Sequence, residues 1–251
     1  MTYCVGILTR EGLAMIGDTR TNAGVDNVAT FRKLTTFDFP GERAIVLASS
    51  GNLATSQTVA SLVTEGLENP QTNEIEKITT VPSMFRAAQF VGRAVREAHR
   101  AIGPDRGEGL NAAGFDVTFL LGGQIRAGRL RLFMVYDAGN FIEATVDTPY
   151  LQIGEHKYGK PILDRAITAE TSIADALKLG LISMDSTMRS NLAVGMPIDI
   201  AVIRRDEIKV ALAHRVDNAD PYFARLRNSW SEALRAAHQA IPPPPYGQPG
   251  G

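Results

Sequence analysis

Cysteine is scarce in this sequence: Cys4 is the one cysteine among 251 residues. A single cysteine allows no intrachain disulfide, and such usage is typical of proteins that work in a reducing compartment. We therefore expect a cytoplasmic protein. The four histidines lie far apart and have no second cysteine near them, which excludes a zinc site with local ligand spacing.

Net charge and long apolar segments are missing as well. Lysine and arginine number 26 and aspartate and glutamate 27, so the formal net charge is -1. This balance predicts no nucleic-acid partner and no attraction to an anionic membrane. No apolar run approaches the roughly 20 residues that a membrane span needs, and the first residues lack the basic region of a secretory signal.

Common catalytic motifs are also absent. The sequence contains no nucleophile elbow G-x-S-x-G, no phosphate-binding G-x-x-x-x-G-K-[ST] loop and no zinc-binding H-E-x-x-H. Glycines cluster over residues 103–114, but they precede a predicted strand and do not join a strand to a helix. Turn chemistry favours a flexible loop there over a phosphate cradle.

What is present is a regular succession of strand and helix patterns. Short segments that are apolar on one or both faces predict strands, whereas Met84, Ala88 and Val91 recur at the spacing of a helix face. The predicted strands are residues 3–9, 13–17, 33–39, 43–48, 115–121 (ended by Gly122-Gly123), 130–136, 141–144, 199–203 and 208–212. The predicted helices are residues 52–67, 84–102, 161–167, 172–188 and 221–241.

The predicted helices come mostly in pairs between groups of strands, not singly between parallel strands. This order argues against a doubly wound parallel sheet. It predicts an α+β fold in which two antiparallel sheets each carry a helical layer outside, a four-layer αββα sandwich. We expect one domain over residues 1–241, with an added C-terminal helix at about 221–241, and a Pro/Gly-rich tail over 242–251.

The second residue offers unusual chemistry. Threonine is small, so removal of the initiator Met1 would leave Thr2 as the N-terminal residue. A free N-terminal threonine carries its hydroxyl beside an α-amine with a pKa of about 7.7–8, which suits a general base. Such a pair is a recognised nucleophile and base. Many chains begin Met-Thr, so the hypothesis depends on the neighbouring residues.

Three further residues could complete a site around Thr2. Asp18 ends the strand expected to pair with the first, and Lys33 opens the third. A lysine there would stabilise a deprotonated hydroxyl and keep the α-amine neutral, while Asp18 would hold the lysine charged. Gly51 precedes a predicted helix, where a backbone N–H can stabilise an oxyanion. The alternatives are a plain salt bridge at a sheet end and an ordinary turn glycine.

These residues lie in motifs that resemble the proteasome β-subunit superfamily of N-terminal nucleophile hydrolases. The resemblance covers about residues 2–215, and the MTYCVGI start, the M-D-S-T-M-R-S-N segment and the long last helix are most similar to Anbu, the bacterial ancestral β-subunit family. The motif residues are Thr2, Gly6, Ile7 and Gly12; Gly17, Asp18, Arg20 and Gly24; Lys33-Leu34; Ser50-Gly51; Tyr136-Asp137 with Gly139; Ile153-Gly154; and Met184-Asp185-Ser186 before Asp199-Ile200-Ala201-Val202.

The resemblance also implies a role for each site residue. The implied site has Thr2 as nucleophile, Asp18 and Lys33 as its supporting pair, Gly51 as the oxyanion N–H, Arg20, Asn22 and Ser50 lining the cleft, and Asp185 with Ser186 or Ser190 of the following loop binding the N-terminal amine. One position departs from the pattern. Proteasome subunits usually carry serine after the glycine that aligns with Gly154, and this chain has Glu155.

The implied activity is that of a threonine-type endopeptidase that works through a Thr2 acyl-enzyme, without a metal or an organic cofactor. Its implied partners are a peptide or polypeptide substrate and further copies of itself, in a homo-oligomeric ring or open spiral. The last helix and the tail are candidates for contacts between subunits. Two alternatives stay open: an amidase for a small or modified substrate, and a non-catalytic ring scaffold.

Overall fold

The computed structural model describes residues 1–22, 28–70, 72–102 and 115–246. The glycine-rich segment 103–114 and the motif residue Gly24 lie outside this part of the chain. The chain divides into two compact units, Met1–Asn218 and Ala219–Gly251. Each is described by itself.

The first five-stranded sheet of the larger unit contains the N-terminal strand. Its order is β12 (Tyr150–Gly154), β1 (Tyr3–Leu8), β2 (Gly12–Asp18), β13 (Ile198–Arg204) and β14 (Val210–Val216), and every neighbouring pair is antiparallel. All of β2 and nearly all of β1 are buried, as their apolar faces predict. The head of β1 therefore lies between β12 on one side and the end of β2 on the other.

The second five-stranded sheet faces the first. Its order is β11 (Phe141–Glu143), β10 (Arg131–Val135), β9 (Val117–Ile125), β6 (Arg43–Gly51) and β5 (Leu34–Phe39), again with antiparallel pairs throughout. A cluster of buried apolar side chains from both sheets, including Leu13, Met15, Val46, Leu120 and Leu132, fills the space between them. This core joins the two sheets and fixes where their strand ends lie.

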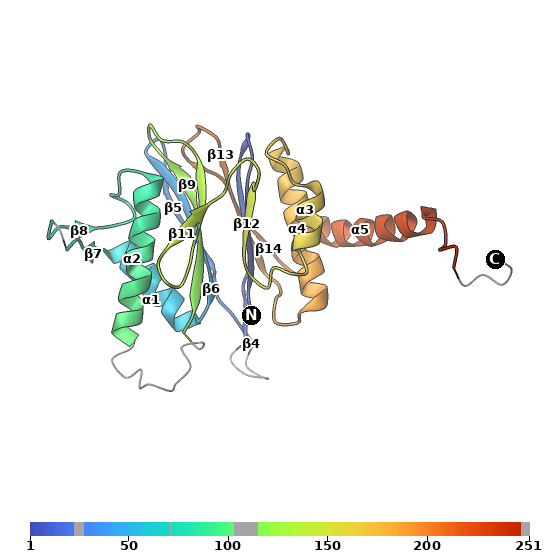
Figure 1. Ribbon diagram of the computed structural model, residues 1–251, viewed down its shortest axis with the longest axis horizontal. Helices are drawn as coiled ribbons and strands as arrows, with labels where there is room; N and C mark the ends of the chain where they lie inside the picture. The colour runs from blue at the N-terminus through green and yellow to red at the C-terminus, as the bar shows by residue number, and fades with distance from the viewer. Residues whose placement is uncertain (23–27, 71, 103–114, 247–251) are drawn as a thin grey trace. The chain divides into compact units, whose positions relative to one another are not determined.

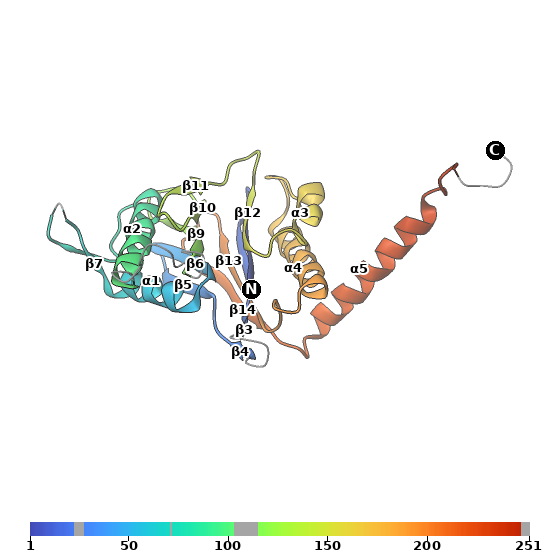
Figure 2. The ribbon, with the colours of Figure 1, turned by 60° about the horizontal axis from the view of Figure 1, so that its bottom comes forward.

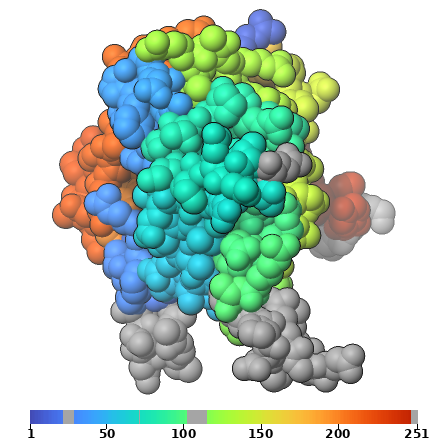
Figure 3. Space-filling model, turned by 90° about the vertical axis from the view of Figure 1, so that its left-hand side faces the viewer, coloured from blue at the N-terminus to red at the C-terminus, as the bar shows by residue number. Residues whose placement is uncertain are grey.

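Helices cover the outer faces of both sheets (Figures 1 and 2). α1 (Leu53–Glu65) and α2 (Met84–Ile102) pack on the second sheet, and α2 buries the stripe that its sequence predicts, including Ala88, Val91 and Val95. Figure 3 shows this face, with the cyan and green helices across it. α3 (Lys160–Ala166) packs on α4 (Ile173–Ser190), which lies on β1 and β2. The expected α+β class with antiparallel sheets is confirmed.

Two strand predictions are wrong in their extent. The glycine pair Gly122-Gly123 does not end β9, which continues to Ile125. Gly122 has no Cβ, and the Leu13 side chain packs into the space where a Cβ would lie. The last strand of the sheet begins at Val210, not Ile208, because the turn before it is longer and holds Asp206 and Ile208 at positive φ.

Several strands have no counterpart in the sequence prediction. The most important is β12, which pairs with β1 along its whole length. The others are the short pairs β3 (Arg20–Asn22) with β4 (Val28–Thr30) and β7 (Leu67–Glu68) with β8 (Ile75–Glu76). Asp18 to Asn22, which the sequence prediction assigns to no strand or helix, is therefore largely extended chain.

The smaller unit contains α5 (Pro221–Ala240), which begins as predicted. Asp220 caps it by accepting a hydrogen bond from the backbone N–H of Phe223 at 2.7 Å. Phe223 and Leu226 are buried, whereas Leu234 is 51% exposed in the second half of the helix. Across the described residues, the helices are too short or too polar to cross a membrane.

Candidate active site

Thr2 lies at the head of β1, immediately before its first residue. Its side chain is buried, whereas the preceding Met1 is 65% exposed. The backbone N–H of Glu155 donates to the Thr2 carbonyl at 2.7 Å, which ties this residue to the end of β12. Gly154 has φ +80°, and a Cβ there would lie 2.0 Å from the Thr2 carbonyl oxygen. Thr2 is thus held against a position that only glycine can occupy.

Asp18, at the end of β2, is fully buried beside this strand head. Its Oδ1 accepts from the Tyr3 backbone N–H at 3.0 Å and from Lys33 Nζ at 2.7 Å, and its Oδ2 accepts from the Gly195 N–H at 3.2 Å. Burial raises the pKa of Asp18, and Lys33 and the two backbone donors oppose that rise. One carboxylate therefore links the residue after Thr2 to the buried lysine.

Lys33 is held from two directions. Besides its ion pair with Asp18, its ammonium donates to the backbone carbonyl of Arg20 at 2.7 Å. Lys33 itself is 7% exposed. Two oxygen partners fix the position of this charge, which is what a group that stabilises a nearby alkoxide requires.

Gly51 and Ser50 close β6 on the opposite sheet. Gly51 has φ +107°, and a Cβ there would lie 2.1 Å from the Asp116 carbonyl oxygen. Asn52 follows as the N-cap of α1, accepting from the Thr55 N–H at 3.0 Å. Gly51 therefore stands at the positive end of a helix, where a backbone N–H suits an anion. Ser50 is buried and pairs with Thr118 of β9.

Arg20 and Asn22 both belong to β3. The Arg20 guanidinium donates to the Leu192 carbonyl at 2.9 Å and covers Gly195 so closely that a Cβ there would lie 2.4 Å from it. The side chain of Asn22 lies outside the described part of the structure. The structure thus brings Arg20 together with Lys33, through the Arg20 carbonyl.

Ser186 and Ser190 do not lie in a loop after Asp185, and that expectation is corrected: both belong, with Asp185, to the last turns of α4. Asp185 is buried, with its Oδ2 3.3 Å from Arg189 Nε. Ser186 is half-buried and Ser190 is exposed. The segment lacks glycine and proline before Gly195, so the helix continues to Ser190.

The loop that follows α4 supplies contacts that the sequence analysis missed. Asn191 Nδ2 donates to Glu155 Oε2 at 2.8 Å, and Asn191 Oδ1 accepts from the Ala193 N–H at 2.9 Å. The Gly195 N–H then reaches Asp18. The signal available in the sequence was the Gly-Met-Pro turn before β13, but nothing local indicates which residues it would meet.

The whole chain is similar to several solved structures. It is 50% identical to a mutant Anbu from Hyphomicrobium sp. strain MC1, with a TM-score of 0.88, and the match covers 97% of this chain and 99% of that one. It is 44% identical to Anbu from Yersinia bercovieri, with a TM-score of 0.88 and coverage of 98% and 100%. It is 42% identical to Anbu in a helical assembly from Pseudomonas aeruginosa, with a TM-score of 0.88 and coverage of 98% and 100%.

No protein-family model matches the sequence, and no curated protein matches it either. The structural relatives nevertheless cover nearly the full chain at 42% identity or more. The chain therefore belongs to the Anbu, or ancestral β-subunit, family of bacterial proteasome-like proteins.

Proposed function

We propose that this protein is a threonine-type N-terminal nucleophile peptidase that works in the cytoplasm and hydrolyses peptide bonds through an acyl-enzyme on Thr2. The observation that carries the proposal is the Asp18 carboxylate, which binds both the Tyr3 N–H and the Lys33 ammonium. This contact puts a buried ion pair one residue from the candidate nucleophile. A plain salt bridge at a sheet end would be exposed, whereas this pair is not.

The proposed reaction begins once Met1 has been removed, and the exposure of Met1 leaves it open to an aminopeptidase. The Thr2 Oγ attacks the substrate carbonyl, and its proton passes to the Thr2 α-amine. The Gly51 N–H stabilises the oxyanion, and Lys33 stabilises the developing alkoxide. The protonated amine gives its proton to the leaving amine, and water then hydrolyses the ester to release the acid and free Thr2.

The supporting residues keep the roles that the family resemblance implies. Ser50 and Arg20 border the cleft, together with Asn22. We assign Asp185, with Ser186 or Ser190, to the amine side of the site. These residues lie on α4. The Thr2 carbonyl itself accepts from the backbone N–H of Glu155, and Asn191 donates to the Glu155 carboxylate.

The fold and its relatives support the larger assembly. The two facing sheets with outer helices are the arrangement expected of a four-layer sandwich, the architecture that we propose for this chain. A helical assembly has been solved for the Anbu complex of P. aeruginosa. We infer a homo-oligomer, a ring or an open spiral, in which α5 contributes to subunit contacts.

A small pocket lined in part by Lys33 could hold the side chain of the substrate residue before the scissile bond, so its size bears on which residue the protein prefers there. Its volume is about 40 Å³, and Ser49, Leu53 and Gln57 help to line it. A cavity needs about 10–15 Å³ on this measure to hold one water. The pocket therefore has room for a side chain of up to about three heavy atoms, and we infer a preference for a small residue, from alanine to valine, before the scissile bond.

Intact-mass measurement combined with a threonine-directed electrophile tests the proposal. We expect the purified protein to lack Met1 and to gain one adduct on Thr2. Thr2→Ala should abolish labelling, whereas Thr9→Ala, which alters a buried threonine near the far end of β1, should leave it unchanged.

Substrate assays separate the proposal from its alternatives. Hydrolysis of peptides and casein supports a peptidase, and activity confined to small amides supports an amidase. A retained Met1 together with no labelling supports a non-catalytic scaffold.

A further inference from the structure

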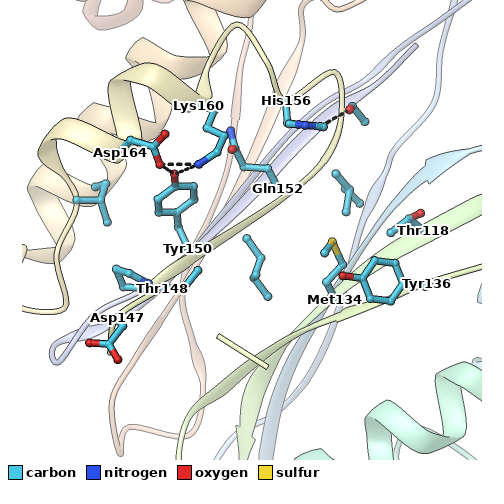
Figure 4. A pocket seen from close by; sticks show the side chains of 15 residues that line it. Thr118, Met134, Tyr136, Asp147, Thr148, Tyr150, Gln152, His156, Lys160 and Asp164 are labelled. Carbon is cyan, nitrogen blue, oxygen red and sulfur yellow. Dashed lines mark hydrogen bonds and ion pairs between the residues drawn. The ribbon is translucent and has the colours of Figure 1, made fainter. Parts of the chain in front are cut away.

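A cavity of the larger unit runs along β12 and is not used by the reaction above. It has a volume of about 620 Å³. Figure 4 shows its walls: Tyr150, Lys160 and Asp164 lie together on the side of α3, and Thr118, Met134 and Tyr136 lie opposite, on the strands of the second sheet. The cavity is therefore a groove between α3 and the second sheet, with β12 along its length.

The strand that lines the groove is β12, and its open edge faces the cavity. Residues from both faces of β12 line the groove, Leu151 and Ile153 from one face and Tyr150 and Gln152 from the other. A cavity reaches both faces of a strand only where it passes along the strand's edge. β12 is indeed the first strand of its sheet and pairs with β1 on its other side.

The register shows which backbone groups face the groove. The Glu155 N–H donates to the Thr2 carbonyl, and the Leu8 N–H donates to the Pro149 carbonyl, both at 2.7 Å. Hydrogen-bonded and non-hydrogen-bonded pairs alternate in an antiparallel ladder. Gln152, opposite Val5, is thus a non-hydrogen-bonded residue, and its backbone N–H and C=O point away from β1 to the open edge. The same holds for Tyr150.

One end of the groove meets the candidate nucleophile. Gly154, which lines it, packs against the Thr2 carbonyl without room for a side chain. Thr118, on the opposite wall, pairs with Ser50 beside the candidate oxyanion donor. At the far end, Lys160 Nζ bonds Asp164 Oδ1 at 2.6 Å and the Tyr150 hydroxyl at 3.1 Å.

The groove and the pocket beside Lys33 flank Thr2 on opposite sides. The sheet order β12-β1-β2 puts the groove on the β12 side of the strand head and the Asp18–Lys33 pair on the β2 side. A peptide that crosses Thr2 can therefore place the residues before its scissile bond in one cavity and the residues after it in the other.

We propose that the groove binds the leaving half of an extended peptide substrate, which adds to β12 as a further strand. This inference rests on the peptidase function proposed above. Backbone bonds to Gln152 and Tyr150 would hold the peptide, and alternate side chains would face Met134 and Ile153. From Gly154 to Tyr150 the edge is about 13 Å long at roughly 3.3 Å per residue, so four residues of the leaving half occupy it.

A series of peptides with one alanine-terminated acyl half and leaving halves of one to six residues tests the length. We expect kcat/KM to rise up to four residues, by about tenfold or more, and then to level off, since each peptide hydrogen bond contributes about a two- to tenfold gain. An aminocoumarin amide of the same acyl half reports the reaction without a leaving peptide. If that amide is hydrolysed and the series is flat, the groove proposal is wrong and the peptidase proposal stands.

Gln152→Pro and Gln152→Ala form a matched pair for the open edge. Both lose the side-chain hydrogen bond to the Tyr3 hydroxyl, but only proline loses the outward N–H, and an edge strand tolerates it there. We expect the ratio of long- to short-peptide kcat/KM to fall about three- to tenfold in Gln152→Pro and to persist in Gln152→Ala. Equal ratios in the two variants would overturn the proposal. A general loss of activity lowers kcat/KM for long and short peptides alike, so it does not change the ratio within a variant.

A binding measurement decides the case if no substrate is hydrolysed. The probe is a fluorescent six-residue peptide added to the full-length Thr2→Ala protein in its assembled state. Binding that Gln152→Pro weakens and Gln152→Ala spares supports the groove, even though the peptidase function would then have failed. No binding, or a change of oligomeric mass in Gln152→Pro instead, overturns it, since the edge would then be a contact between subunits.

Discussion

At the scale of single residues, Asp18 joins the parts of the candidate site. It receives backbone donors from Tyr3 and Gly195, which are 192 positions apart in the chain, and the ammonium of Lys33. A buried ion pair is weak evidence for stability, because desolvation offsets much of the attraction. We therefore propose that the pair beside Thr2 serves chemistry that needs a fixed positive charge.

Lys33→Met tests this assignment. It leaves the Asp18 carboxylate buried without its counter-ion, and we expect a loss of about 3–5 kcal/mol in the free energy of unfolding, together with loss of electrophile labelling. The double variant Asp18→Asn, Lys33→Met should recover most of the stability and none of the labelling. Urea unfolding and mass spectrometry measure the two effects. Labelling that survives in either variant would contradict the role of the pair.

Gly154→Ala tests the contact behind Thr2. The change puts a Cβ at φ +80° and 2.0 Å from the Thr2 carbonyl oxygen. Gly41→Ala is the control, because Gly41 has φ +77° with no atom within 4 Å of the added carbon. We expect Gly41→Ala to cost about 1–2 kcal/mol from backbone strain and Gly154→Ala clearly more. Similar melting temperatures for the two variants would show that the space is not tight.

At the scale of elements, the loop from Asn191 to Pro197 connects α4 to β13 and surrounds the strand head. It accepts Arg20 at the Leu192 carbonyl, donates to Asp18 from Gly195, and bonds Glu155 through Asn191. Its conformation is therefore set by residues from three other parts of the chain. The carboxylate of Glu155 gives the loop an anchor at Asn191.

Asn191→Asp tests the hydrogen bond to Glu155 while keeping the hydrogen bond that Asn191 accepts within its own loop. Aspartate keeps the acceptor for the Ala193 N–H but loses the donor to Glu155 and places two carboxylates together. We expect Asn191→Asp to slow labelling of Thr2 at least as much as Asn191→Ala, with a stability loss of about 1–3 kcal/mol. Labelling kinetics and thermal unfolding measure this. A normal labelling rate in Asn191→Asp would mean that Glu155 does not anchor the site.

At the scale of the whole molecule, the candidate site and the proposed subunit contacts belong to different units. All the proposed catalytic and substrate-binding residues lie in Met1–Asn218, whereas α5 lies in Ala219–Gly251. The second half of α5 exposes Leu234, and Ile241, which follows the helix as its C-cap, is exposed as well. We infer that these exposed apolar side chains contact another chain.

Leu234→Glu tests the separation of assembly from chemistry. We expect light scattering to show a smaller assembly, because a charge would enter the apolar contact, while the isolated subunit still reacts with a threonine-directed electrophile. Ala236→Glu adds the same charge on the opposite face of the helix and should assemble normally. Equal masses for the two variants would exclude this face of α5 from the subunit contact.

Local patterns along the chain were sufficient for most elements. Spacing and side-chain chemistry that neighbouring residues already show were sufficient for the helix stripe of α2, for the doubly apolar strands β1 and β2, and for the motifs around Thr2, Asp18, Lys33 and Gly51. These features depend on contacts within an element or between adjacent elements. The family resemblance could be stated for the same reason, since its motifs are short.

Contacts between distant segments required the tertiary structure. The pairing of β12 with β1, the position of Gly195 against Asp18 and the link from Glu155 to Asn191 each join residues more than thirty positions apart. The extension of α4 by its last two residues, Arg189 and Ser190, and of β9 through its two glycines likewise depends on packing partners elsewhere in the chain. Short-range preference cannot specify such contacts, because their energy comes from surfaces that meet only when the two sheets and their helices have assembled.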